Sequence, residues 1–558
     1  MGAWQCPSTD LAVQCGPASF SSTALRHWLA QGCTTFPPIR QGFAALLSQP
    51  DGSAVLAVSN RWEISVLYAE TPAGWVIGTH PRDVIEALPT PPPLSLEALA
   101  DLVALHDEPD TTVFTGVRRV PLGHLVRFAP GTDPVVERWF RPDTDEDHSI
   151  GPAEAPALMR AAVRDAVAAS LPDAGPIAAT LSGGLDSSMV VSTAAAALRG
   201  SGRRIAAYTH VPLPGTPDPS AVYEADDGPY ARATAAHVGG IDLHELVNTA
   251  RELPLDTTQA AIEASWQPPF NPINLTWIVG ALDGAASVGS PVLLTGSSGN
   301  ATFSRERDGI VRELAAQHRW RAIVADIRAQ HRAGIPRSFT LRTTARDVTP
   351  ERVLAQWHRL RRRVDLDALV PSQHDLPFRD ELISDAARAE LPSMSAGFRP
   401  RRRDFLDFVR WDGFRLGWVQ NLTPDVWWSD PLSDPEVVAL ALRLPEEAWL
   451  AGGRDRGLAR EALAGQVPDV VRLRHAHGAQ GADTGTITRP HVDRYRAVLE
   501  RIRSSTTAST VIDTDRLEAS LGAPFHDPRT VLQWQGVYGR AFGLGQFICW
   551  YEDEVLSR

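Results

Sequence analysis

The sequence predicts an α/β protein in which a β-rich N-terminal unit precedes a larger unit built on a parallel sheet. Short apolar runs broken by turn residues fill the first 140 residues, whereas helical and strand-like patterns alternate between about residues 154 and 295. An acidic stretch without large apolar residues, followed by Gly151 and Pro152, separates the two patterns. We therefore predict a domain at 1–140, a linker at 141–152 and a second domain at 153–558.

The elements of both units follow from the spacing of apolar residues. In the N-terminal unit we expect one helix at 94–106 and strands at 54–58, 64–68, 75–78, 113–114 and 124–128. In the second unit we expect helices at 154–171, 187–198, 229–238 and 274–286, alternating with strands at 177–181, 205–209, 243–247 and 291–295. Beyond about residue 304 arginine-rich helical segments replace the strands.

Composition excludes several classes of protein. With 43% hydrophobic and 22% charged residues the chain is neither disordered nor fibrous, and its net charge of −12 opposes non-specific binding of nucleic acid or anionic lipid. The sequence has no run of about 18 apolar residues and no secretory pattern, and its four cysteines form no C-x-x-C pair. We therefore expect a cytoplasmic protein that binds neither membranes nor nucleic acid. All 54 basic residues are arginine, so no lysine can take part in its chemistry.

The strongest local signal is the sequence LSGGLDSS at residues 181–188, between a predicted strand and a predicted helix. Free N–H groups at the start of a helix, glycines that let the backbone come close and serine hydroxyls together suit a phosphate or pyrophosphate. Asp186 is placed to hold Mg²⁺ against such phosphates. A glycine turn with a serine cap is the alternative interpretation. The candidate phosphate-binding residues are Leu181, Ser182, Gly183, Gly184, Leu185, Asp186, Ser187 and Ser188.

This loop resembles the pyrophosphate-binding loop of the ATP pyrophosphatase superfamily, in the form found in asparagine synthetases. Stretches 226–240, 291–300, 430–438 and 456–474 resemble further parts of that family, so the resemblance covers most of the chain. It implies a Rossmann-like ATP-binding domain with a helical C-terminal part, in which backbone at Thr295 and Gly296 contacts the nucleotide. It also implies that ATP and Mg²⁺ activate a carboxylate as its adenylate, from which an amine displaces AMP.

Residues 114–124 resemble the closing part of the family's glutaminase domain, which implies an N-terminal αββα sandwich of the Ntn type. That domain requires cysteine as its mature first residue, because the thiolate attacks glutamine while the α-amine serves as the base. Here Gly2 follows Met1, and Cys6 becomes terminal only after unusual trimming. We therefore predict an inactive glutaminase-like domain and a nucleophilic amine that is already part of a substrate.

Three departures from the family affect the synthetase site. Asn300 and Ala301 replace an aspartate and a glutamate, so Asn300 offers a carbonyl oxygen to the metal but no charge. Ser297 stands where asparagine synthetases carry glutamate and β-lactam synthetases carry tyrosine. The catalytic lysine is missing; Arg474 is our candidate for its electrostatic role, and a surface arginine is the alternative.

This combination resembles the lasso peptide cyclases, which activate an Asp or Glu side chain of a precursor peptide for attack by the peptide's own N-terminal amine. The expected partner is the precursor core peptide; participation of a leader peptidase and a leader-recognition protein is left open. Two arginine runs and nearby tryptophans are candidates for a peptide groove, with an exposed face and a buried core as the alternatives. They are 359–363, 399–403, Trp411, Trp418, Trp427 and Trp428.

Three other functions remain open at this stage. A β-lactam synthetase and an ammonia-dependent asparagine synthetase both predict different chemistry at position 297. A non-catalytic peptide-binding scaffold accounts for Asn300, Ala301 and the missing lysine, but not for the intact loop at 181–188. Release of AMP distinguishes the enzymes from the scaffold.

Overall fold

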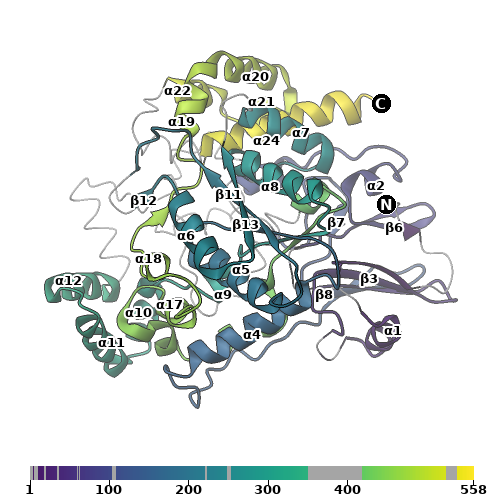
Figure 1. The fold of residues 1–558 in the computed structure, drawn as a ribbon. Helices are drawn as coiled ribbons and strands as arrows, with labels where there is room; N and C mark the ends of the chain where they lie inside the picture. Colours follow the sequence, from purple (N-terminus) through teal and green to yellow (C-terminus); the bar gives the residue numbers. More distant parts are fainter. Residues whose placement is uncertain are drawn as a thin grey trace.

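The computed structural model shows two units that pack against each other, with the parallel sheet near the centre of the molecule (Figure 1). It describes residues 4–5, 11–17, 20–33, 35, 37–59, 61, 63–103, 108–219, 223–247, 253–269, 271–349, 382, 418–522 and 537–558.

The N-terminal unit contains two antiparallel sheets that pack face to face. One has the order β1-β6-β5-β7, with β1 at Trp4–Gln5, β6 at Gly74–Gly78, β5 at Leu67–Thr71 and β7 at Val117–Arg119. The other has the order β2-β3-β4-β8-β9, at Leu11–Cys15, Phe43–Ser48, Ala54–Val58, His124–Phe128 and Val135–Arg138. Tyr68 of β5 meets Phe128 of β8 across the interface, with ring centroids 5.6 Å apart.

Helices pack outside these two sheets. Trp28 of α1 (Ser22–Ala30) contacts Phe43 of β3 edge to face, and Leu99 of α3 (Leu96–Val103) lies in one buried cluster with Leu67 of the other sheet. The strand expected at 113–114 is reduced to an isolated antiparallel bridge between Phe114 and Leu94. The Thr112 hydroxyl bonds to the carbonyls of both Phe114 and Val117, so the chain turns there and the strand begins at Val117 instead.

The parallel sheet expected in the second unit is confirmed, with the strand order β13-β11-β10-β14-β15. The strands are Ile241–Val247, Ile205–Val211, Ile177–Thr180, Val292–Leu294 and Trp427–Ser429, and all four pairs are parallel. Small buried side chains such as Ala178 and Ala179 let helices cover both faces of β10. The helices nearest the sheet are α4 at Ala155–Ser170, α5 at Leu185–Ala197, α6 at Gly228–Val238 and α8 at Leu275–Ser287.

Strand β15 corrects two expectations. First, the expectation that only helices follow residue 304 is wrong, because β15 lies beyond it. Second, Trp427 and Trp428 lie inside this strand and are only 7% and 2% exposed, and Trp418 is 3% exposed. These rings belong to the core because the sheet edge and the N-terminal unit cover them, so they do not line a peptide groove. Trp411 and both arginine runs lie outside the described residues.

Most of the remaining helices form two groups, one at the lower left and one at the top of Figure 1. One group is α10 at Arg307–Ala316, α11 at Trp320–Arg332 and α12 at Arg337–Val348, with α17 at Gly457–Ala462 and α18 at Asp469–Arg472 nearby; the other is α20 at Val492–Ser504, α21 at Thr506–Val511, α22 at Thr514–Leu521 and α24 at Gly539–Tyr551, with α7 at Pro254–Ser265. No helix in the described part of the chain is long and apolar enough to cross a membrane. The domain boundaries proposed above stay a prediction.

Candidate functional site

The site lies at the carboxyl end of two neighbouring strands. β10 leads into the loop at 181–184 and then into α5, and β14 leads into the loop at 295–298 and then into the short helix α9 (Gly299–Thr302). Because β10 and β14 are parallel neighbours, both loops leave the sheet at the same edge. This is the edge at which open parallel sheets bind their ligands.

The first loop is held together by its own serines. The Ser187 hydroxyl accepts the backbone N–H of Ser182 at 3.1 Å and lies 2.9 Å from the Ser182 hydroxyl, which in turn accepts the N–H of Gly184 at 3.2 Å. Gly184 is the N-cap of the 13-residue helix α5. The loop therefore presents short polar side chains and the positive end of a long helix to the same space, as phosphate binding requires.

Asp186 lies in the first turn of α5 and is the acidic group of the site. Its Oδ2 accepts a hydrogen bond from the Ser304 hydroxyl at 3.0 Å, whereas its Oδ1 is buried without a hydrogen-bond partner. Burial raises the pKa of the Asp186 carboxyl, and the positive charge of Arg456 and the Ser304 hydrogen bond oppose that shift. A buried carboxylate oxygen without a partner, next to a phosphate-type loop, fits a ligand of bound Mg²⁺.

The second loop packs directly on the first. A Cβ on Gly296 would lie 2.8 Å from the carbonyl carbon of Asp186, and a Cβ on Gly299 would overlap the Asp186 carboxylate. Only glycine allows this approach. The second loop also bonds to β15 and the residue after it, through the Thr295 N–H to the Ser429 carbonyl at 2.8 Å and the Ser298 N–H to Asp430 Oδ2 at 2.7 Å.

Asn300 lies close to Asp186 but is not buried. Its Oδ1 is 3.5 Å from the Ser304 hydroxyl that also bonds to Asp186, so Ser304 brings the two candidate metal ligands together. In the part of the chain that the structure describes, no group of three or more His, Cys, Asp or Glu side chains could hold a metal. The site therefore fits a metal that takes most of its ligands from ATP phosphates.

Arg474, the candidate for the electrostatic role of the missing lysine, lies against the first loop. A Cβ on Gly183 would come 2.5 Å from its Nη1, and the Arg474 side chain is only 6% exposed. Nη1 donates to Asp227 Oδ1 at 2.6 Å, Nη2 lies 2.8 Å from Glu224 Oε2, and the guanidinium stacks on the Tyr230 ring at 3.9 Å. A surface arginine is thus excluded, because three side chains hold this cation at the phosphate loop.

A pair of short strands brings the segment that contains Arg474 close to the first loop. β12 (Tyr223–Glu224) pairs in parallel with β16 (His477–Gly478), and the Ala479 N–H donates to the Glu224 carbonyl at 2.8 Å. The pair joins the segment before α6 to the segment after α18. Burial and a hydrogen bond to Glu224 raise the pKa of the Tyr230 hydroxyl, so this ring stays neutral beside the guanidinium.

The comparison with protein families matches the asparagine synthase family over residues 158–401 and 430–539, which is more than half of the chain. The chain belongs to the asparagine synthase family. It is accordingly an ATP-dependent, AMP-forming carbon–nitrogen ligase by family, and the matched residues contain both loops and Arg474. Among curated proteins none matches this chain.

The cysteines of the described residues show no activated thiol. Burial raises the pKa of Cys15 to about 11 and that of Cys33 to about 12, so neither forms the thiolate that a glutaminase needs. Burial likewise raises the pKa of Cys549 to about 11. Cys6 lies outside the described residues.

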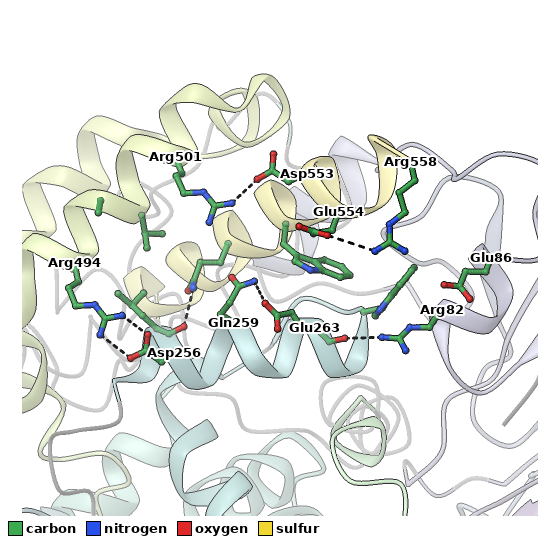
Figure 2. A pocket seen from close by; sticks show the side chains of 16 residues that line it. Arg82, Glu86, Asp256, Gln259, Glu263, Arg494, Arg501, Asp553, Glu554 and Arg558 are labelled. Atoms are coloured by element: carbon green, nitrogen blue, oxygen red, sulfur yellow. Dashed lines mark hydrogen bonds and ion pairs between the residues drawn. The ribbon is translucent and has the colours of Figure 1, made fainter.

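A separate cavity of about 990 Å³ lies between α2 (Pro81–Ile85), α7, α20 and α24 (Figure 2). Its charged side chains largely pair with one another: Arg494 with Asp256, Arg501 with Asp553 and Arg558 with Glu554. The loops at 181–184 and 295–298 do not contribute to it. The cavity is therefore separate from the two loops.

Sequence reasoning missed three residues of the site: Ser304, Arg456 and Asp430. Asp430 and Arg456 are far from both loops in the sequence, and Ser304 follows α9 in a stretch without a recognisable motif. Asp430 and Arg456 both lie in stretches that resemble the family, so their position in those stretches was the available signal.

Proposed function

We propose that the protein forms an intramolecular isopeptide bond, a macrolactam, in a ribosomal lasso precursor peptide. The reaction uses ATP to activate an Asp or Glu side chain of the core peptide, and the N-terminal amine of the same peptide attacks the acyl-adenylate. We further propose a cytoplasmic location, the core peptide as partner, and an N-terminal unit of the inactive Ntn type.

The observation that carries this proposal is the serine at position 297, in a chain whose first loop keeps its complete phosphate-binding sequence. Ser297 bears neither the acid of an asparagine synthetase nor the tyrosine of a β-lactam synthetase, and its hydroxyl lies 3.2 Å from that of Thr295. The first loop meanwhile keeps its glycines, its serines and Asp186, and Arg474 supplies a cation beside it. A tethered amine suits such a site, because it depends on positioning more than on strong activation.

In the first step a carboxylate oxygen of the peptide attacks the α-phosphorus of ATP and pyrophosphate leaves. The Ser182–Ser188 loop and the start of α5 bind the pyrophosphate, and Mg²⁺ held by Asp186, with Asn300 as a neutral ligand, would neutralise its charge. In the second step the amine nitrogen attacks the acyl carbon, AMP leaves and the nitrogen releases a proton. Arg474 stabilises the negative charge that develops, since a guanidinium keeps its proton.

The test is mass spectrometry of a candidate core peptide incubated with the full chain, ATP and Mg²⁺, with AMP and pyrophosphate assayed in the same tube. We expect the peptide to lose one water as AMP forms, and both changes to disappear in Asp186→Ala. Asp133→Ala, an exposed aspartate far along the chain from the loops, is the matched control and should behave like the wild type. Peptide binding without AMP or dehydration, with the neighbouring gene products supplied, would instead establish a scaffold.

A further inference from the structure

We propose that the N-terminal unit positions the second ATP loop, through a buried contact from Glu63 to Asp430. Glu63 lies between β4 and β5 of the N-terminal unit, and Asp430 directly follows β15 of the parallel sheet. Glu63 is then a positioning residue for adenylation, an inference that rests on the proposed ligase activity.

Glu63 is fully buried and accepts hydrogen bonds from both units. Within its own unit it pairs with Arg61, also fully buried, and accepts the Gly42 N–H at 2.7 Å. From the parallel sheet it accepts the Trp427 indole N–H at 3.0 Å and the Asp430 backbone N–H at 2.7 Å. A buried carboxylate with this many donors fixes their positions, because each donor that loses its acceptor would stay unsatisfied.

Asp430 passes this constraint to the second loop. Its side chain is buried and accepts two backbone N–H groups, that of Ser298 at 2.7 Å on Oδ2 and that of Leu432 at 3.1 Å on Oδ1. Ser298 directly precedes Gly299, the residue that packs on the Asp186 carboxylate. Three consecutive contacts thus lead from Glu63 to the metal-binding residue of the first loop.

Arg61 adds a second link between the units. Its Nη2 donates to the Ser429 hydroxyl at 3.1 Å, and the Ser429 carbonyl accepts the Thr295 N–H of the second loop. Both ends of the loop at 295–298 are therefore bonded to residues that the Arg61–Glu63 pair contacts. The N-terminal unit accordingly has a role in the synthetase site that needs no glutaminase chemistry.

The test compares Glu63→Gln with Asp347→Asn. The amide of glutamine keeps the shape of Glu63 but turns an NH₂ group toward N–H donors, so the contact to Asp430 or to Trp427 is lost. Asp347 is an equally buried acid, 1% exposed and paired with Arg307 at 2.8 Å in the α10–α12 group, and reports the effect of general destabilisation. Hydrogen exchange of residues 295–304 is measured in the full chain without ATP, and the KM for ATP is measured by ATP–pyrophosphate exchange in the presence of the candidate core peptide, whose carboxylate forms the adenylate.

We expect Glu63→Gln to speed exchange at 295–304 at least about tenfold and to raise the KM for ATP about tenfold with a smaller change in kcat, whereas Asp347→Asn leaves both near wild type. Adding Glu63→Gln to Asp430→Asn should change the KM by less than about twofold, because Glu63 acts on the second loop through Asp430 and the two contacts are consecutive. If Glu63→Gln does not fold, Trp427→Phe removes one donor to Glu63 and should accelerate the same exchange.

Unchanged exchange at 295–304, or equal effects of Glu63→Gln and Asp347→Asn, would overturn the inference. A different outcome is hydrogen exchange that responds as expected in a protein that shows no ATP–pyrophosphate exchange. It would support the contact between the units and refute the ligase activity instead. The two proposals therefore fail by different measurements.

Discussion

The two ATP loops share one architecture and differ in what holds them. Both connect a strand of the parallel sheet to a helix at the same edge, but the first leads into a helix of 13 residues and the second into a helix of only four. The first loop is cross-linked by its own serines, whereas the second is bonded to Ser429 and Asp430, more than 130 residues further along the chain.

The two loops therefore differ in the groups that they contribute to the site. The first loop leads into the long helix that carries the Asp186 carboxylate, and Arg474 lies against it, so the candidate charged groups for adenylation gather there. The second loop carries Ser297 and Asn300, which are neutral, and contributes mainly close backbone packing through Gly296 and Gly299. We therefore expect substitutions on the first loop to change catalysis most, and those on the second to act through geometry or metal affinity.

The largest effect is expected at Arg474. Arg474→Ala removes the cation from the first loop and should lower kcat for amide formation about 10²-fold or more, since loss of a preorganised charge acts on the transition state. Arg474→Lys should restore little, because an ammonium cannot contact Asp227, Glu224 and the Tyr230 ring in the same geometry. Single-turnover measurement of peptide dehydration tests both.

Arg204→Ala is the matched control for Arg474. Arg204 also pairs with an acid, Asp242, but it is 55% exposed and lies at the opposite end of β11 from the loops. The kcat of this control should equal that of the wild type. An Arg474→Ala enzyme with wild-type kcat would show that the guanidinium only supports the fold.

The contact between the two loops is tested by Gly299→Ala. The added Cβ would overlap the Asp186 carboxylate, so the carboxylate must move and ATP–pyrophosphate exchange should fall about 10²-fold. Gly151→Ala is the control: its added methyl group has no atom within 4 Å, so the rate of ATP–pyrophosphate exchange should stay unchanged. Similar rates for the two variants would mean that the loops separate when ATP binds.

A smaller effect is expected at Asn300, the neutral metal-ligand candidate of the second loop. Asn300→Asp adds a carboxylate beside Ser304 and Asp186 and should lower the Mg²⁺ concentration for half-maximal activity about fivefold, because charge on the ligands sets the affinity for hard cations. Magnesium titrations of exchange activity test this. An unchanged midpoint in the Asn300→Asp variant would place this side chain outside the metal shell.

The parallel sheet was predictable because its buried strands are short apolar runs alternating with helices. The strands at Ile177–Thr180 and Val292–Leu294, and the loops that follow them, lie within a residue or two of the expected positions. Arg474 was also singled out from the sequence, because the resemblance places the missing lysine near it; its role in catalysis stays a prediction. These features depend on local pattern or on a motif with fixed spacing.

What the sequence did not reveal depends on contacts between distant segments. β15 is only three residues long and contains two tryptophans, a pattern that a groove or a core explains equally well. Its place beside β14 follows from the tertiary fold. Likewise Glu63 has no motif, and its importance appears only once Asp430 and Trp427 lie next to it.

The support of the second loop also predicts a pH dependence of stability. Burial raises the pKa of Asp430 from 3.8 to about 6, opposed by its bonds to Ser298 and by Arg61. Between about pH 4 and pH 6 the folded chain therefore binds a proton that the unfolded chain has released, so wild-type stability falls as the pH rises through this window and levels off above it. Asp430→Asn lacks the titrating group, and the free energy of unfolding of the wild type should decrease relative to this variant by about 2 kcal/mol between pH 4.5 and pH 7.5. Chemical denaturation of both proteins at about pH 4.5, 6 and 7.5 measures this difference. If the free energy of unfolding of the two proteins changed with pH in parallel, Asp430 would keep its ordinary pKa, and the carboxylate that holds the second loop would be as easily charged as one in water.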